Sequence, residues 1–184
     1  MAPQLSMRRA NLEGLREQPL PEGCAIRTYL EGDAEAWCAI MNESIGSGWT
    51  LERFQNEMLD PPQSDPAGLF FVACEDKPIA TACAWRDSVG EREVGLVHMV
   101  GVLKAHRGKK LGRVLTLRVL HYLKEHGFRS AELSTDDFRL PAIRIYLDCG
   151  FEPKLIHESH RARWAEVVAE LGIPAIPEGF RNGL

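Results

Sequence analysis

A short basic loop between two apolar segments carries the residue types needed to bind an anion. It reads Arg107-Gly108-Lys109-Lys110-Leu111-Gly112, and an apolar helical pattern begins at Leu111. Gly108 and Gly112 can adopt backbone dihedrals that other residues avoid, and they let a ligand approach the main chain. Amides in the first turn of the following helix have no intrahelical partners, and their partial positive charge attracts phosphate. The loop therefore predicts a phosphate site, with a basic surface loop as the alternative.

The loop differs from two common nucleotide-binding loops. Dinucleotide folds need Gly-x-Gly-x-x-Gly and P-loops need four residues between their glycines, whereas Gly108 and Gly112 enclose three. The formal net charge of the 184-residue chain is −4, which gives no general attraction for nucleic acid. Positive charge is instead concentrated at one place, which suits a single phosphate-rich small molecule. That cluster consists of His106, Arg107, Lys109, Lys110 and Arg113.

A second motif lies at 140–151, Leu-Pro-Ala-Ile-Arg-Ile-Tyr-Leu-Asp-Cys-Gly-Phe. Pro141 suits an early helical position, and Gly150 suits a left-handed cap at the other end. We therefore expect a short helix that carries Tyr146.

Together the two segments resemble motifs A and B of the GNAT acyltransferase superfamily. In motif A, Arg/Gln-x-x-Gly-x-Gly/Ala holds the pyrophosphate of coenzyme A, and here Lys110 stands in place of the middle glycine. In motif B, Arg139 replaces the usual Asn. The positions that match motif B are Ala142, Ile145, Tyr146, Gly150 and Phe151. The stretch 97–102 is further similar to the acyltransferase halves of mycothiol synthase and its relatives.

The resemblance implies one α/β domain with a central mixed sheet flanked by helices. The fourth and fifth strands of that fold splay apart to admit the pantetheine arm, and the donor is acetyl-CoA, with no metal. The backbone of the fourth strand would pair with the pantetheine amides, and the motif A loop would hold the phosphates. The implied coenzyme-binding residues are Val100, Gly101, Val102, Arg107, Gly108, Lys109, Lys110, Leu111, Gly112, Arg113 and Arg139.

The implied reaction is acetyl transfer from a thioester to a primary amine by direct attack. A base must remove a proton from the ammonium form of the acceptor, and an acid near the sulfur assists the departing thiolate. No covalent enzyme intermediate is needed, so the cysteines are not expected to act as nucleophiles. A catalytically silent acyl-CoA-binding module and a nucleotide-binding regulator are the alternatives.

His98 is the candidate base because it is the only ionisable residue between Val94 and Val102, and an imidazole accepts protons near neutral pH. A hydrogen-bonded packing histidine is the alternative. Glu93 and Glu43 are weaker candidates, since such carboxylates are more often solvated.

Tyr146 is the candidate acid, because the resemblance places the tyrosine of motif B near the coenzyme sulfur. The alternative is an aromatic side chain buried for packing. Arg139 could pair with a phosphate or with Asp136 or Asp137, or it could be exposed to solvent. We expect the acceptor near 44–49 and after His157.

Apolar runs predict strands at 25–30, 69–74, 79–86, 94–102, 130–134 and 151–156. Periodicity and capping residues predict helices at 34–42, from 51 to before Pro61, at 111–126, from 140, and at 161–171. The strand at 94–102 is nearly all apolar and therefore central, and it should run parallel to 130–134. We divide the chain into an N-terminal extension (1–23), a GNAT core (24–157) and a C-terminal helix and tail (158–184).

Five cysteines at wide spacing predict neither a disulfide framework nor a zinc site, which favours a reducing cytoplasm. No apolar run approaches the length of a membrane span, and no membrane partner is expected. The predicted partners are acetyl-CoA and an unidentified amine, with a homodimer left open. Trp49 and Trp85 are candidate walls of the acceptor site, or else core residues.

Overall fold

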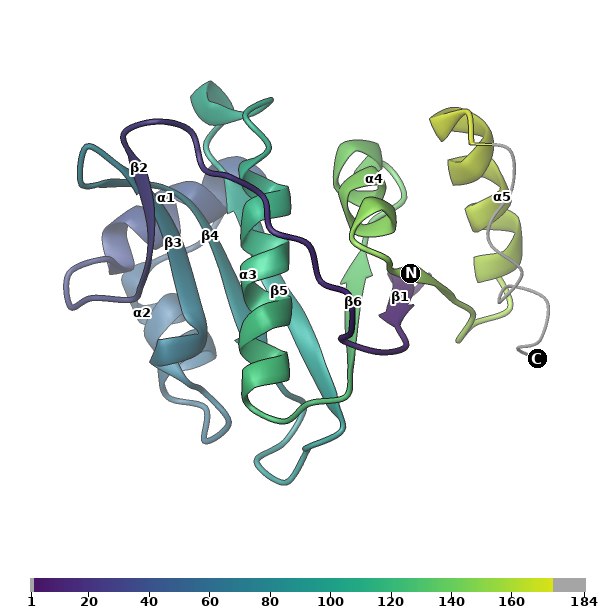
Figure 1. The fold of residues 1–184 in the computed structure, drawn as a ribbon, viewed down its shortest axis with the longest axis horizontal. Coiled ribbons are helices and arrows are strands. Elements are labelled where there is room, and N and C mark those ends of the chain that lie inside the picture. Colours follow the sequence, from purple (N-terminus) through teal and green to yellow (C-terminus); the bar gives the residue numbers. More distant parts are fainter. Residues whose placement is uncertain (1, 174–184) are drawn as a thin grey trace.

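Strand β5 (Val94–Val102) lies at the centre of a seven-stranded mixed sheet with the order β2-β3-β4-β5-β6-β1-β7. The computed structural model describes residues 2–173, and within them helices cover both faces of the sheet (Figure 1). The α/β class and the central position of 94–102 are confirmed. The other strands are β1 (Leu5–Arg9), β2 (Cys24–Thr28), β3 (Leu69–Cys74), β4 (Lys77–Trp85), β6 (Ser130–Thr135) and β7 (Glu152–Lys154).

The helices follow the predicted order. They are α1 (Ala34–Ser44), α2 (Leu51–Phe54) with its π-helical continuation η1 (Gln55–Leu59), α3 (Leu111–Glu125), α4 (Leu140–Asp148) and α5 (His160–Leu171), with short 3-10 turns at η2 (Pro66–Gly68) and η3 (Lys104–His106). Residues 174–184 of the predicted tail lie outside the described residues.

Two hydrophobic clusters hold β5 between helices on opposite faces. On one face, Val97 packs in a cluster with Leu115 and Val119 of α3. On the other face, α1 contributes Trp37 and Ile40 to the second cluster. Figure 1 shows α3 in front of the sheet and α1 behind it. The strand is therefore fixed from both sides.

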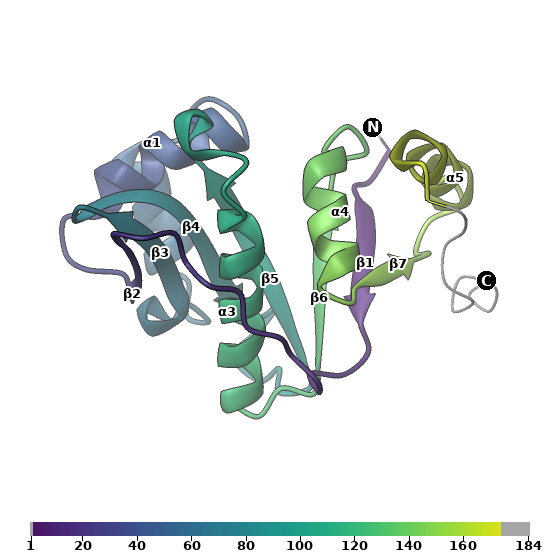
Figure 2. The same ribbon diagram turned by 45° about the horizontal axis from the view of Figure 1, so that its top comes forward.

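Strands β5 and β6 are parallel neighbours only at their beginning. Val94, Gly95 and Leu96 pair with Ser130, Ala131 and Glu132, and no pairing follows beyond these residues. Helix α3 makes the crossover between the two strands, as predicted. The strands then separate towards the ends that carry α4 and η3 (Figure 2). The predicted splay is present, and it opens the molecule at the centre of the sheet.

A bulge changes the direction of β5 within this open region. Thr81 pairs with Gly101 and Cys83 with His98, so one residue of β4 faces two residues of β5. Met99 has a φ of 51°, in the left-handed region that a side chain rarely adopts. A bulge leaves its extra residue outside the regular ladder and re-aims the side chains that follow.

The first strand was not predicted. Residues 1–23, which we expected to extend from the core, contribute β1, and this strand pairs antiparallel with both β6 and β7. Leu5 and Met7 are fully buried in the larger cluster. Two apolar residues in a five-residue polar context are too short a pattern to distinguish a strand from a loop.

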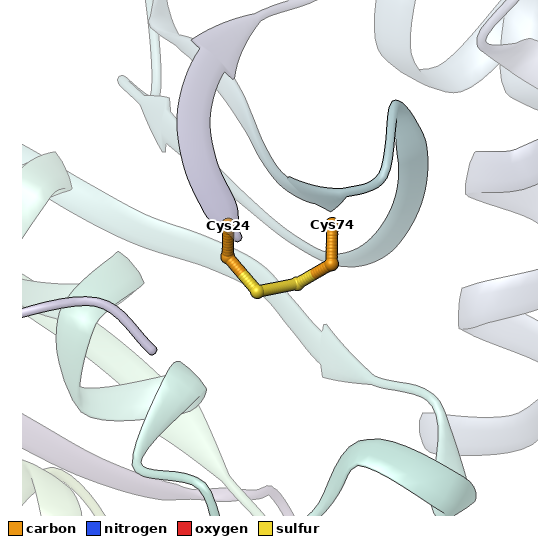
Figure 3. Close-up of a disulfide and its surroundings, with 2 residues drawn as sticks. All are labelled: Cys24 and Cys74. Atoms are coloured by element: carbon orange, nitrogen blue, oxygen red, sulfur yellow. A yellow bond between two sulfur atoms is a disulfide. The ribbon is translucent and has the colours of Figure 1, made fainter. Parts of the chain in front are cut away.

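The expectation of no disulfide was wrong. Cys24 at the start of β2 and Cys74 at the end of β3 face each other across the two antiparallel strands and are joined by a disulfide (Figure 3). They are separated by 50 residues in sequence. Spacing alone gives no sign of this pair, because only the register of β2 against β3 brings the two residues together.

We predict that alkylation of the unfolded protein without reductant modifies Cys38, Cys83 and Cys149, the free cysteines of the structure, and spares the other two. Replacing Cys24 and Cys74 together by Ala should lower the free energy of unfolding by about 2–4 kcal/mol, because the loop closure is lost. Mass spectrometry and urea unfolding measure the two effects. Reductant should destabilise the original protein and leave the variant unchanged, and five modified cysteines would contradict the disulfide.

Candidate active site

A cavity of about 500 Å³ lies between the end of β5, the basic loop and the first turns of α3 and α4. All of the predicted coenzyme-binding residues except Lys109 line this cavity. The ten that line it are Val100, Gly101, Val102, Arg107, Gly108, Lys110, Leu111, Gly112, Arg113 and Arg139. We call this space the coenzyme cavity.

The loop has the backbone shape that an anion site requires. Gly108 has a φ of 79°, and a Cβ placed there would meet no atom within 4 Å, so the space beside it is open. Lys110 has a φ of 61° and stands immediately before α3. A non-glycine residue in this left-handed conformation costs about 1–2 kcal/mol. The loop therefore keeps the glycine-like shape at a position where the family pattern has glycine.

Arg107 fastens the loop to the protein. Its Nε donates to the carbonyl oxygen of Val102 at 3.2 Å and its Nη2 donates to that of Glu43 at 3.0 Å. The carboxylate of Glu43 accepts from the amide of Lys104 at 2.9 Å. Arg107 and Glu43 thus hold the loop in place through hydrogen bonds. The sequence did not predict that the Glu43 carboxylate would accept a hydrogen bond from the main chain.

Two buried polar atoms in the lining residues are without a partner among the described residues. They are Nε of Arg113 and Nδ1 of His106. The guanidinium of Arg113 also lies 3.7 Å from a carboxylate oxygen of Asp148, a weak contact for a cation. An unpaired buried donor such as Arg113 Nε is costly, and the positive charges of Arg107, Lys110 and Arg113 in the lining favour phosphate oxygens. The residues present therefore fit a phosphate-bearing coenzyme.

The three β5 residues predicted to contact the pantetheine differ in what they offer. Both backbone groups of Val102 are already bonded to the Ser44 hydroxyl, with Oγ donating to the carbonyl at 3.1 Å and accepting from the amide at 3.0 Å. The amide of Leu103 donates to Ile79 of β4, so by alternation Gly101 also faces β4. Val100, which lines the cavity, is left as the residue best placed to pair with a ligand.

Close packing of α1 on β5 requires a glycine at position 101. A Cβ there would overlap Met41 and lie 3.0 Å from Ile40 and 3.2 Å from Ser44, all on α1. The glycine lets α1 sit directly on β5, which places Ser44 against Val102.

A second cavity of about 520 Å³ shares Val100, Arg139, Ala142 and Tyr146 with the first. His98 lines it, together with Glu132 of β6 and Lys154 of β7. Lys154 Nζ donates to both carboxylate oxygens of Glu132 at 2.7 Å. Sequence reasoning missed this ion pair, because β6 and β7 come together only through β1. We call this space the acceptor cavity.

His98 is half-buried in the wall of the acceptor cavity. Burial lowers the pKa of its imidazole, and the carboxylates of Asp87 and Glu57 oppose that shift. Its ring lies 5.6 Å from that of Trp85, and the described residues give it no hydrogen-bond partner. A neutral imidazole facing a cavity can accept a proton, so the geometry permits a base at this position.

Tyr146 lies between the two cavities and is 8% exposed. Burial raises the pKa of its phenol to about 12, and the charge of Arg139 acts in the opposite direction. Its hydroxyl finds no hydrogen-bond partner among the described residues. A phenol with a raised pKa keeps its proton at neutral pH and can donate a hydrogen bond to a thiolate sulfur.

The remaining candidates lie elsewhere. Glu93 pairs with Arg129 at 3.4 Å, at the far end of β5 from the bulge. Trp49 is buried in the second cluster, edge-on to Trp37 at 5.1 Å, and Trp85 does not line the acceptor cavity. Of the predicted acceptor region, Ser44 lines the coenzyme cavity and Ile45 the acceptor cavity.

A splayed mixed sheet, with a basic glycine-containing loop and two cavities that share lining residues at the splay, is the arrangement expected of an acyl-coenzyme A-dependent transferase. The profile of the Acetyltransferase (GNAT) family matches residues 34–151, and the chain belongs to this family.

Curated relatives agree with this membership, and a solved structure agrees with the fold. The chain is 35% identical over 158 residues to a mycothiol acetyltransferase from Thermomonospora curvata, covering 80% of this chain and 50% of the relative. A second, from Thermobispora bispora, is 35% identical over 156 residues, covering 79% and 52%. The chain therefore spans about half the length of these relatives.

A GCN5-related N-acetyltransferase from Sphaerobacter thermophilus superposes with a TM-score of 0.66 at 24% identity, covering 83% of this chain and 50% of that one, which supports the fold. Within residues 2–173, no helix is long and apolar enough to cross a membrane. The same residues contain no group of three or more His, Cys, Asp or Glu placed to hold a metal ion.

We predict that Gly108→Val weakens coenzyme A binding by at least about tenfold, because a β-branched residue disfavours this backbone conformation and crowds the open space. Gly127→Val is the matched control. Gly127 also has a positive φ of 85°, and a Cβ at this position would likewise meet no atom within 4 Å, but it lies at the other end of α3. Isothermal titration calorimetry should show normal affinity for the control, and equal losses in both variants would argue against a loop-specific role.

Proposed function

We propose that the protein is an N-acetyltransferase that transfers the acetyl group of acetyl-CoA to a primary amine by direct attack. The observation that carries this proposal is that Val100 and Tyr146 line both cavities. In the proposed arrangement, a thioester whose phosphates lie at the basic loop extends through the coenzyme cavity towards these two residues. The amine approaches them from the acceptor cavity.

In this mechanism His98 accepts a proton from the acceptor amine, directly or through water, because burial favours its neutral form. The free amine attacks the thioester carbonyl carbon, the C–N bond forms and the C–S bond breaks. Tyr146 donates a hydrogen bond to the sulfur as it becomes a thiolate. The attacking nitrogen then releases its second proton to solvent, and the thiolate takes a proton from the imidazolium or from solvent.

A catalytically silent acyl-CoA-binding module is the second candidate. One observation favours it, namely that Ser44 already occupies the backbone groups of Val102 and so reduces the edge available to the pantetheine. Turnover of any amine would exclude it. A cytoplasmic location stays a prediction from composition, and the Cys24–Cys74 disulfide weighs against a reducing compartment.

The first test compares ligands by thermal shift. We expect coenzyme A and acetyl-CoA to raise the melting temperature more than ATP or NAD at equal concentration, because a ligand held by the folded state stabilises it by RT ln(1 + [L]/Kd). Thiol release is then followed with amino sugars, polyamines, amino acids and peptides. Mycothiol-related amines come first, since the relatives are named for mycothiol. A nucleotide shift without a coenzyme A shift would reject the proposal.

With an accepted amine, kcat/KM should rise with pH through a limb whose midpoint lies below about 6.5, the ordinary imidazole pKa. The sign follows from burial, which disfavours the imidazolium and keeps the base form at lower pH. His98→Gln should remove this limb, whereas Tyr146→Phe should lower kcat by about tenfold or more at every pH and retain acetyl-CoA affinity. A destabilised His98→Gln variant with an unchanged pH profile would make His98 a packing residue.

A further inference from the structure

Arg139 connects the two walls of the splayed region. Its Nε donates to Asp136 in the loop after β6 at 2.8 Å. Its Nη1 and Nη2 donate to the carbonyl oxygens of Ser44 at 2.8 Å and Ile45 at 3.0 Å, at the end of α1. Helix α1 packs on β5, whereas Asp136 belongs to the β6 side. The guanidinium therefore spans the opening that the separation of the two strands creates.

The end of α1 has a physical need for this contact. The last carbonyls of a helix have no intrahelical partners, and they carry the negative end of the helix dipole. Helix α1 has no basic residue in its own last turn. Arg139 supplies a cation and two donors from across the opening, and its planar fork suits two neighbouring carbonyls.

Ser44 continues the connection to β5. Its carbonyl is bonded to Arg139, while its hydroxyl is bonded to both backbone groups of Val102. A continuous path of hydrogen bonds thus runs from Asp136 through Arg139 and Ser44 to Val102. Each step joins groups that lie in or beside the coenzyme cavity.

Arg139 also stands at the start of the helix that carries Tyr146. It precedes Leu140, the first residue of α4, and Tyr146 lies about two helical turns further on. Both residues line both cavities. The position of α4 relative to β5 sets how far the Tyr146 hydroxyl lies from a thioester beside Val100.

We propose that Arg139 is a positioning residue that fixes the width of the slot between β5 and α4, in which the pantetheine arm lies. This rests on the proposed function. The competing role, a phosphate ligand, fits less well because three donors of the side chain are already bonded to protein oxygens. An unpaired buried donor in the lining of the coenzyme cavity belongs instead to Arg113.

The test compares two probes by isothermal titration calorimetry. Coenzyme A occupies the loop and the slot, whereas adenosine 3′-phosphate 5′-diphosphate keeps the pyrophosphate and has no pantetheine arm. A slot of fixed width lowers the entropic cost of ordering the arm, so Arg139→Met should weaken the binding of coenzyme A by about tenfold and change the affinity for the nucleotide by less than about twofold. Arg139→Lys keeps the positive charge and loses the planar guanidinium, so it should lower the affinity for coenzyme A to an intermediate extent. This variant replaces Arg139→Met in the comparison if the Met variant does not fold.

Ser44→Ala tests whether the effect passes through Ser44. If it does, the double variant Ser44→Ala/Arg139→Met should bind coenzyme A about as weakly as the weaker single variant. Arg163→Met is the matched control, because Arg163 binds Asp137, the neighbour of Asp136, and lines neither cavity. Its affinity for both probes should be unchanged.

Equal losses for both probes in Arg139→Met would make Arg139 a phosphate ligand, and unchanged affinity for coenzyme A in both Arg139 variants would remove the positioning role. Additive losses in the double variant would also overturn the path through Ser44. An original protein that binds neither probe would instead reject the proposed function itself.

Discussion

The early separation of β5 from β6 is the constraint on which the rest of the structure depends. The two strands pair over three residues. Beyond Leu96 of β5 and Glu132 of β6, the edges that these strands turn towards each other are no longer paired. Backbone amides and carbonyls without partners are costly away from water. The Ser44 hydroxyl satisfies those of Val102, and Val100 is left beside the cavities. An incomplete sheet thus becomes a site in which an extended ligand with amide groups can act as the missing strand.

The separation persists because β5 is held by other contacts. Gly95 admits Leu123 of α3 and Gly101 admits Met41 of α1, so helices on opposite faces approach the backbone closely at both ends of the strand. Side chains at these positions would push the helices away. Packing of this kind stabilises only one arrangement, since interiors are too dense to deform continuously. Strand β6 is fixed separately by its five-residue register with β1.

The sequence was sufficient for elements that depend on local pattern and insufficient for contacts that depend on topology. The strands at 69–74 and 94–102 have the predicted bounds because the first is a continuous apolar run and the second is interrupted only by His98 among apolar residues and glycines. Asp33 stands at the N-cap of α1, yet its carboxylate makes no cap hydrogen bond and instead binds Arg27 and the amide of Leu30. The basic loop could be predicted from its glycines and charges. The contacts of Arg139 with Ser44 and Ile45, 94 or more residues away, could not, because they exist only once β5 and β6 have separated.

Strain in the backbone points to the same site. Four non-glycine residues have a positive φ among the described residues, and Glu75 and Asp76 are the central pair of the β3–β4 turn, where such dihedrals match the twist of the strands. The other two are Met99, in the bulge of β5, and Lys110, immediately before α3. Met99 lines the acceptor cavity and Lys110 the coenzyme cavity. Residues that break a local rule persist where the surroundings impose them, and they concentrate at functional sites. The two strained positions therefore lie in the walls of the two cavities, one in each.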